Sequence, residues 1–149
     1  GNLIPIDKMF FGYRFRFKEI LFLWTTGIGT LVIVVNVLLK NLWGRARPND
    51  ILQFGGEGVF TPWYIFGHSC VSNCSFVSGD ASVGFSLIVF YFITKKNIFI
   101  YLSLISGICL GVVRIIAGGH FLSDIIFSQI VVTTTLFVFF ILYKRLSND

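Results

Sequence analysis

Arg114, His120 and Asp124 are ionisable residues that lie close together in an otherwise apolar part of the sequence. His120 and Asp124 are four residues apart, so they share one face if the segment is a helix, and the carboxylate can then hold the imidazole. Arg114 would lie on the wrong face of one continuous helix. However, Gly118-Gly119 is a natural place for the chain to break and reverse, which lets the arginine face the histidine. We therefore expect this turn to face a phosphate group.

Each of these three residues also has an ordinary explanation. An arginine can extend toward a membrane interface, a histidine can simply occupy a turn, and an aspartate can cap the start of a helix. The apolar surroundings favour a functional role, because ionisable groups at membrane depth are costly and usually mark a functional site.

The composition is that of an integral membrane protein. Apolar residues make up 55% of the 149 positions, charged residues only 13%, and the mean hydropathy is +0.83. Four apolar stretches approach the roughly 20 helical residues that cross a bilayer: residues 20–39, 78–94, 98–117 and 121–143, of which the second is the shortest. The sequence thus predicts an all-α, polytopic transmembrane helical bundle in a single membrane-embedded domain over residues 1–149.

The positive charges indicate how the bundle is oriented. If the four spans alternate, one side carries eight cations and the other four, so the first side is cytoplasmic by the positive-inside rule. His120 then faces outward, which in a bacterium is the periplasmic side of the inner membrane. The spans divide the basic residues instead of leaving one basic stripe, which argues against a nucleic-acid partner. The larger group is Lys8, Arg14, Arg16, Lys18, Lys95, Lys96, Lys144 and Arg145, and the smaller is Lys40, Arg45, Arg47 and Arg114.

The long outward loop, residues 49–77, is suited to a lid or a substrate-facing surface. Cys70 and Cys74 both fall in it, and we expect them to form a disulfide in an oxidising compartment. A metal site there is less favoured, because only His68 stands nearby. Cys109 lies inside a predicted span, where we expect a small core residue.

Ser78, Gly79 and Asp80 begin the second predicted span. Ser78 is suited to cap the helix, and Gly79 lets a ligand approach the backbone, so the N–H groups of the first turn could bind an anion. The alternative is an ordinary capped helix in which Asp80 interacts with the helix dipole. Chain connectivity places several possible phosphate-binding positions and a histidine at one membrane face: Lys40, Arg47, Ser78, Arg114 and His120.

These residues resemble the three-part signature of the type 2 phosphatidic acid phosphatase superfamily. The first part is Lys40, six residues, then Arg47-Pro48, and the second is Ser78-Gly79. The third is Arg114, five residues, His120, three residues, then Asp124. The segments Asn-Cys-Ser-Phe-Val-Ser-Gly-Asp-Ala-Ser (73–82) and Gly-Gly-His-Phe-Leu-Ser-Asp (118–124) resemble the lipid A phosphatase branch, especially the 4′-phosphatases.

The resemblance implies a phosphatase that needs no metal or other cofactor and works through a phosphohistidine. His120 would be the nucleophile, and Asp124 would orient and activate it. Lys40, Arg47 and Arg114 would bind the phosphate oxygens, helped by the backbone around Ser78 and Gly79. The implied partners are a phosphorylated glycolipid substrate and membrane lipid.

Three features depart from the family pattern. The superfamily usually has histidine where this chain has Asp80, so either Asp80 or His68 is the candidate general acid. It usually has serine where this chain has Val113, and it usually has six spans instead of four, so N-terminal spans are either missing from this chain or absent from the protein. Undecaprenyl diphosphate and phosphatidylglycerophosphate remain alternative substrates, and a non-catalytic lipid-binding or transport protein is an alternative of another class.

Overall fold

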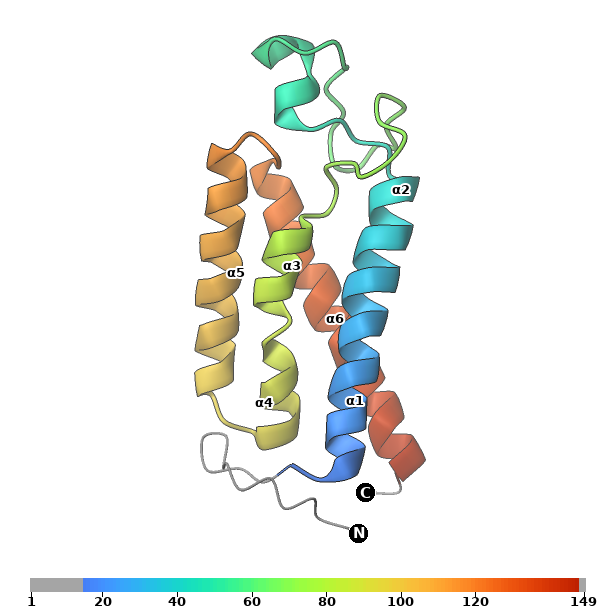
Figure 1. The fold of residues 1–149 in the computed structure, drawn as a ribbon, viewed down its shortest axis with the longest axis vertical. Coiled ribbons are helices and arrows are strands. Elements are labelled where there is room, and N and C mark those ends of the chain that lie inside the picture. The colour runs from blue at the N-terminus through green and yellow to red at the C-terminus, as the bar shows by residue number, and fades with distance from the viewer. Residues whose placement is uncertain (1–14, 148–149) are drawn as a thin grey trace.

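The computed structural model describes residues 15–147, which form a helical bundle (Figure 1). The first helix runs continuously through three parts: α1 (Phe17–Ile28), a π-helical stretch η1 (Gly29–Leu39) and α2 (Lys40–Leu42). Next come two short 3₁₀ turns, η2 (Pro48–Asp50) and η3 (Leu52–Phe54). The remaining helices are α3 (Gly79–Phe85), α4 (Ile88–Thr94), α5 (Ile98–Ile116) and α6 (Leu122–Ser147). No strand occurs within residues 15–147, in agreement with the predicted all-α class.

Three helices are long and apolar enough to cross a membrane: Phe17–Leu42, Ile98–Ile116 and Leu122–Ser147. The second predicted span is the shorter Gly79–Thr94, and it is broken between α3 and α4. At the break, the Ser86 hydroxyl donates to the Val83 carbonyl at 2.7 Å, and Leu87 N–H donates to Gly84 O at 3.4 Å. Glycine and serine are weak helix formers, and these three-residue bonds tighten the chain locally.

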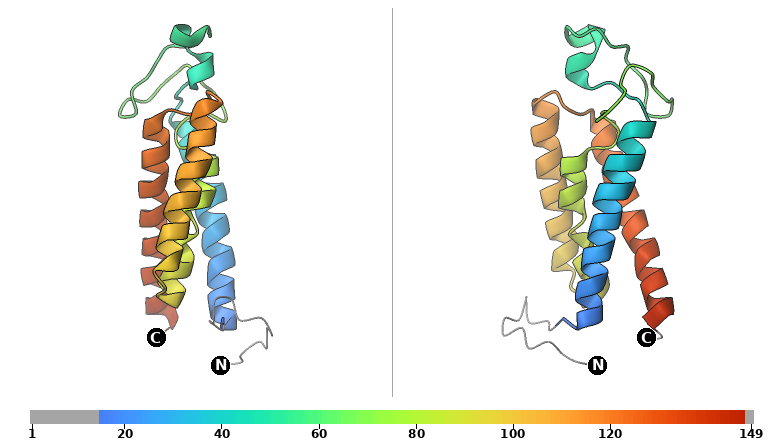
Figure 2. Two further views of the ribbon diagram at one scale, coloured as in Figure 1. Left: turned by 90° about the vertical axis from the view of Figure 1, so that its left-hand side faces the viewer. Right: turned by 45° about the vertical axis from the view of Figure 1, so that its right-hand side comes forward.

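Helix α3 packs against both α5 and α6, which places it in the interior of the bundle (Figure 2). A β-carbon on Gly84 would lie 2.5 Å from the backbone nitrogen of Gly107, so the two glycines let α3 and α5 approach closely. Beside the break, Ser103 Oγ donates to Phe85 O at 2.7 Å and Ser106 Oγ donates to Gly84 O at 3.0 Å. Serines of α5 thus bind carbonyls at the end of α3.

The four helical segments alternate in direction, as predicted. The loop after α2, the start of α3 and the α5–α6 turn lie together at the upper end of the bundle in Figure 1. The start of α1, the α4–α5 connection and the end of α6 lie at the other end. Lys8 and Arg14, which the sequence assigned to that second group of cations, lie outside the described residues. Cys109 was predicted to be a core residue, but its free thiol is exposed on α5, so that prediction is wrong.

Candidate active site

The turn between α5 and α6 has the predicted break. Gly118 has φ +65°, and the turn closes through hydrogen bonds from Gly118 N–H to Ile115 O and from Gly119 N–H to Arg114 O, both 2.9 Å. The loop between α2 and α3 is hydrogen-bonded to this turn through Asn49. Its backbone N–H donates to Gly118 O at 3.1 Å, and its Nδ2 donates to Ala117 O at 3.0 Å. A β-carbon at position 118 would overlap the Asn49 amide, so glycine is required there.

His120 is buried directly after this turn, with 1% of its surface exposed. Its Nδ1 lies 2.7 Å from the backbone carbonyl oxygen of Ser75. A carbonyl oxygen can only accept a hydrogen bond, so we assign the proton of the neutral ring to Nδ1. The lone pair then lies on Nε2, which leaves that nitrogen able to act as a nucleophile.

Asp124 lies near His120, but the two do not share a helical face, because His120 precedes α6, which begins at Leu122. Asp124 is also not the hydrogen-bond partner of the ring, contrary to the prediction from the spacing. Its Oδ2 is 3.7 Å from His120 Nδ1, which is too long for a hydrogen bond. Ser75 Oγ donates to the same oxygen at 2.5 Å, and the N–H of Phe121 donates to it at 2.8 Å. The last bond caps the start of α6, so Asp124 fixes the beginning of this helix directly beside the imidazole.

Arg45 completes the anchoring of Asp124, and the sequence analysis missed this role. Its Nη1 donates to Asp124 Oδ1 at 2.5 Å and to Ser123 Oγ at 2.8 Å, while its Nε donates to Thr61 O at 2.8 Å. Its guanidinium lies 4.2 Å from the ring centroid of Phe121, and only 2% of the residue is exposed. This is a buried ion pair that joins the loop to the first turn of α6.

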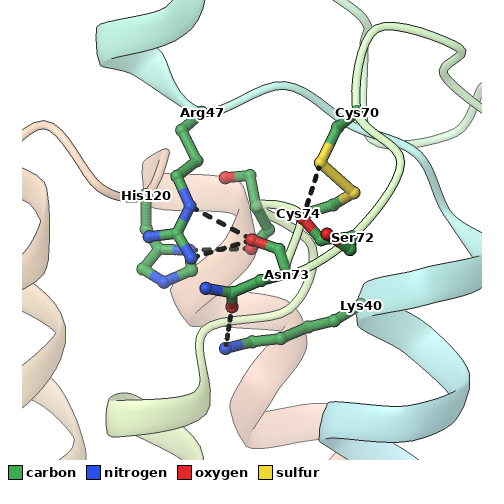
Figure 3. Close-up of a disulfide and its surroundings, with 8 residues drawn as sticks. Lys40, Arg47, Cys70, Ser72, Asn73, Cys74 and His120 are labelled. Carbon is green, nitrogen blue, oxygen red and sulfur yellow. Dashed lines mark hydrogen bonds between the residues drawn. A yellow bond between two sulfur atoms is a disulfide. The ribbon is translucent and has the colours of Figure 1, made fainter.

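Lys40 and Arg47 are both bound to Asn73, a loop residue that the sequence analysis did not single out (Figure 3). Arg47 Nε and Nη2 donate to the backbone oxygen of Asn73 at 3.2 and 2.9 Å, and Lys40 Nζ donates to its side-chain oxygen at 3.4 Å. The predicted disulfide between Cys70 and Cys74 is confirmed, and it closes the loop that contains Asn73. The cross-linked loop thus brings the first part of the signature to the site.

The backbone segment from Asn73 to Ser75 connects these cations to His120. Asn73 holds Arg47 and Lys40, and two residues later the Ser75 carbonyl holds His120. The Ser75 N–H donates to Arg45 O at 2.9 Å, which fixes this segment beside the first part of the signature. No regular spacing in the sequence marks Asn73 or Ser75, because their contacts depend on the path of an irregular loop.

Ser78, Gly79 and Asp80 lie at the start of α3, as predicted, and each is in a different environment. Ser78 is fully buried and caps the helix by accepting from Ala81 N–H at 3.4 Å. A β-carbon on Gly79 would lie 3.0 Å from Lys40 Nζ, so the backbone there is close to that ammonium group. Asp80 is exposed, and its Oδ2 lies 3.0 Å from Arg114 Nε.

Arg114 faces the turn that contains the histidine. A β-carbon on Gly119, the residue before His120, would lie 3.0 Å from Arg114 Nη2. Lys40 interacts electrostatically with Arg47, Arg114 and Asp80, so the three cations and this carboxylate form one charged group beside the start of α3. Within residues 15–147, no hydrogen bond or ion pair joins the exposed His68 to this group.

The amino-acid sequence that forms this site is similar to those of known proteins. A family model described as the PAP2 superfamily matches residues 19–148. A lipid A 4′-phosphatase of Francisella tularensis subsp. novicida (strain U112) is 39% identical over 154 residues, which cover 97% of this chain and 66% of that protein. No solved structure matches the chain.

Two further relatives are the lipid A 4′-phosphatases of Rhizobium etli and Rhizobium leguminosarum. Each is 38% identical over 106 residues, or 66% of this chain, and the aligned parts cover 41% and 46% of those proteins. The chain therefore spans about two thirds of the length of the first relative and under half of the other two.

Proposed function

The chain belongs to the PAP2 superfamily, and we propose that it removes a phosphate monoester from lipid A or a closely related glycolipid. The observation that carries this proposal is the hydrogen bond from His120 Nδ1 to Ser75 O, which leaves Nε2 free to attack. The names of the three relatives support lipid A as the substrate and the 4′ position as the bond that is cleaved.

In the proposed reaction, His120 Nε2 forms a bond to phosphorus while the bond from phosphorus to the sugar oxygen breaks, and that oxygen takes up a proton. Water then attacks the phosphohistidine, releases inorganic phosphate and restores the imidazole. Lys40, Arg47 and Arg114 would stabilise the charge on the non-bridging oxygens, since phosphoryl transfer depends mainly on positioning and charge stabilisation. The phosphate oxygens would replace the protein oxygens that these cations contact in the structure.

The substrate assay measures inorganic phosphate released by the detergent-purified protein in EDTA. Lipid A, undecaprenyl diphosphate and phosphatidylglycerophosphate are offered in separate reactions. Among residues 15–147, no three His, Cys, Asp or Glu side chains are grouped to hold a metal ion, so we expect lipid A turnover to survive the chelator. Faster phosphate release from undecaprenyl diphosphate or phosphatidylglycerophosphate would identify that lipid as the substrate instead. Phosphate release from none of the three would favour a binding or transport protein. Phosphate release that is lost in EDTA and returns only with added Mg²⁺ would refute the metal-free mechanism.

We further propose that the site faces the periplasm from the bacterial inner membrane. Lys18, Lys95 and Lys144 lie at the end of the bundle opposite His120, which favours a cytoplasmic location for that end. A Val71→Cys variant in a Cys109→Ser background should react with a membrane-impermeant maleimide added outside spheroplasts, because Val71 is 91% exposed. Labelling only after the membrane is broken would reverse the orientation.

Asp80 is our proposed general acid. It lies on α3 within the charged group, 3.0 Å from Arg114, and its side chain is 57% exposed. A general acid matters most when the leaving group is a weakly acidic alcohol and hardly at all for a nitrophenolate. We therefore expect Asp80→Asn to slow phosphate release from the glycolipid by about 10²-fold or more and to spare p-nitrophenyl phosphate, if that compound is accepted.

Equal losses on the two substrates would mean that Asp80 instead positions Arg114 through their ion pair. His68→Ala would then be the next variant to compare on both substrates, because His68 was the other candidate acid in the sequence.

A further inference from the structure

A short run of exposed apolar side chains lies beside the active site. Residues 63–66 are Trp63, Tyr64, Ile65 and Phe66, which expose 42%, 65%, 48% and 59% of their surfaces. Four consecutive large apolar residues that remain exposed are unusual in a loop that contacts only water. We call residues 63–66 the aromatic segment.

The aromatic segment is fixed against the end of the first helix. Trp43 Nε1 donates to the Trp63 carbonyl at 2.9 Å, and the Gly67 N–H donates to the Trp43 carbonyl at 2.8 Å. The Phe66 ring packs on the Trp43 ring with centroids 4.6 Å apart. The segment is thus tied at both ends to the residue that follows α2.

Trp63 indicates the depth of the segment relative to the membrane. Its ring packs on Phe127 of α6 with centroids 4.4 Å apart. At about 1.5 Å per residue, the apolar run 125–143 of α6 is about 28 Å long, close to the roughly 30 Å of a bilayer core. Phe127 lies in the first turn of that run, so Trp63 lies at about the level where the hydrocarbon core meets the headgroups.

We propose that the aromatic segment inserts into the interface of the bilayer leaflet on the active-site side. The segment continues the membrane-facing surface of α6, where Ile126 and Ile130 are each 51% exposed. Tryptophan and tyrosine are enriched at this depth, because their rings bury apolar surface while their polar groups stay near water. The aromatic segment therefore contacts the interfacial layer of the lipid bilayer.

The same rings connect the leaflet to the catalytic histidine. Trp43 stacks on Phe76 with centroids 4.5 Å apart, and Phe76 packs on Phe127 at 5.5 Å. Phe76 follows Ser75, whose carbonyl holds His120. Insertion would thus set the height of the nucleophile relative to the headgroups. This consequence for the substrate depends on the proposed function, whereas insertion itself does not.

The test measures depth directly and needs no enzyme activity. In a Cys109→Ser background, Ile65→Cys is labelled with a nitroxide, and the protein is reconstituted in vesicles of phosphatidylethanolamine and phosphatidylglycerol. Collisions with oxygen, which concentrates in the bilayer, are compared with collisions with a water-soluble nickel chelate. We expect the label at position 65 to favour oxygen, as does a reference label at Ile126→Cys on α6.

Phe54→Cys is the matched control, because Phe54 is also an exposed apolar loop residue, 69% exposed. It lies in η3, which is farthest from the helices in Figures 1 and 2, so its label should favour the nickel chelate. Tyr64→Cys repeats the measurement if Ile65→Cys does not reconstitute. Nickel access at the segment equal to that at position 54 would overturn the proposal. So would low access to both reagents, because another protein surface would then cover the segment.

Discussion

His120→Asn is expected to stop phosphate release from the lipid substrate, with a loss of about 10⁴-fold or more, since disabling one member of a catalytic triad costs about 10⁴-fold to 10⁶-fold. The asparagine amide can still donate to the Ser75 carbonyl, so the surrounding contacts are largely kept, but no ring nitrogen remains to attack phosphorus. Phosphate release under single-turnover conditions measures this loss. A matched helical content by circular dichroism would show that the variant is folded.

His68→Asn is the matched control, because His68 is the other histidine in the sequence and is exposed in the loop. It should keep near-normal turnover. When the phosphate of the substrate carries a label, the protein without substitutions should become labelled. The bond to the label should be stable in alkali and broken in acid, as expected for a phosphohistidine. Substantial turnover by His120→Asn, or label that persists in that variant, would rule out the proposed nucleophile.

The helices and the gathering of the signature at one end follow from simple sequence features. Long apolar stretches must satisfy their backbone groups within helices, and alternating spans place residues 40, 47, 78, 114 and 120 at one membrane face. The Gly118-Gly119 break also follows, because glycine readily adopts a positive φ such as the +65° at position 118.

The contacts inside the site could not be predicted in the same way. Arg45 and Asp124 are 79 positions apart, and their pairing depends on how the irregular loop descends onto α6. The sequence places Arg45 only among the outward cations, and nothing in its spacing separates a buried anchor from a phosphate ligand. Likewise, Arg47 and His120 bind the backbone carbonyls of Asn73 and Ser75, which every residue type has. The side-chain contacts of Asn73 with Lys40 and of Ser75 with Asp124 also depend on the path of the loop.

The buried face of α5 was missed although the sequence marks it. Ser103, Gly107 and Gly111 recur every four residues and are all buried, which is the stripe of small residues typical of a closely packed helix face. Cys109 was assigned to the core from its place in the span alone, but it lies on the exposed face. The break between α3 and α4 arises where Gly84 and Ser86 weaken the helix and serines of α5 take up α3 carbonyls, a tertiary effect that local propensity cannot show.

Arg45→Met is expected to lower both stability and activity, whereas changes at the proposed phosphate-binding residues should lower activity and leave stability nearly unchanged. The substitution keeps most of the side-chain volume but leaves the fully buried Asp124 carboxylate without its ion-pair partner. Breaking a buried pair in this way typically costs about 3–5 kcal/mol. Because Asp124 also binds the Phe121 N–H and Ser75, the start of α6 should shift, and a displacement of about 1 Å can reduce turnover about 10²-fold.

Arg47→Met is the control for this experiment, since it removes an arginine two positions away. Arg47 is only partly buried and donates to the backbone oxygen of Asn73, so its loss leaves no buried charge unpaired. We expect the thermal unfolding midpoint of Arg47→Met to be close to that of the protein without substitutions. Inhibition by inorganic phosphate should weaken in Arg47→Met, because a proposed phosphate ligand is lost, whereas in Arg45→Met the loss of activity should be mainly a fall in kcat.

The double variant Arg45→Met/Asp124→Leu separates the structural role of the pair from its catalytic role. Replacing both members of a buried ion pair with apolar residues is often neutral or stabilising, so the unfolding midpoint should recover relative to Arg45→Met. Activity should not recover, because the carboxylate beside His120 is then gone. If Arg45→Met alone kept the normal midpoint and normal turnover, the pair would not position the nucleophile. If it kept the midpoint but weakened phosphate inhibition as Arg47→Met does, Arg45 would instead be a phosphate ligand.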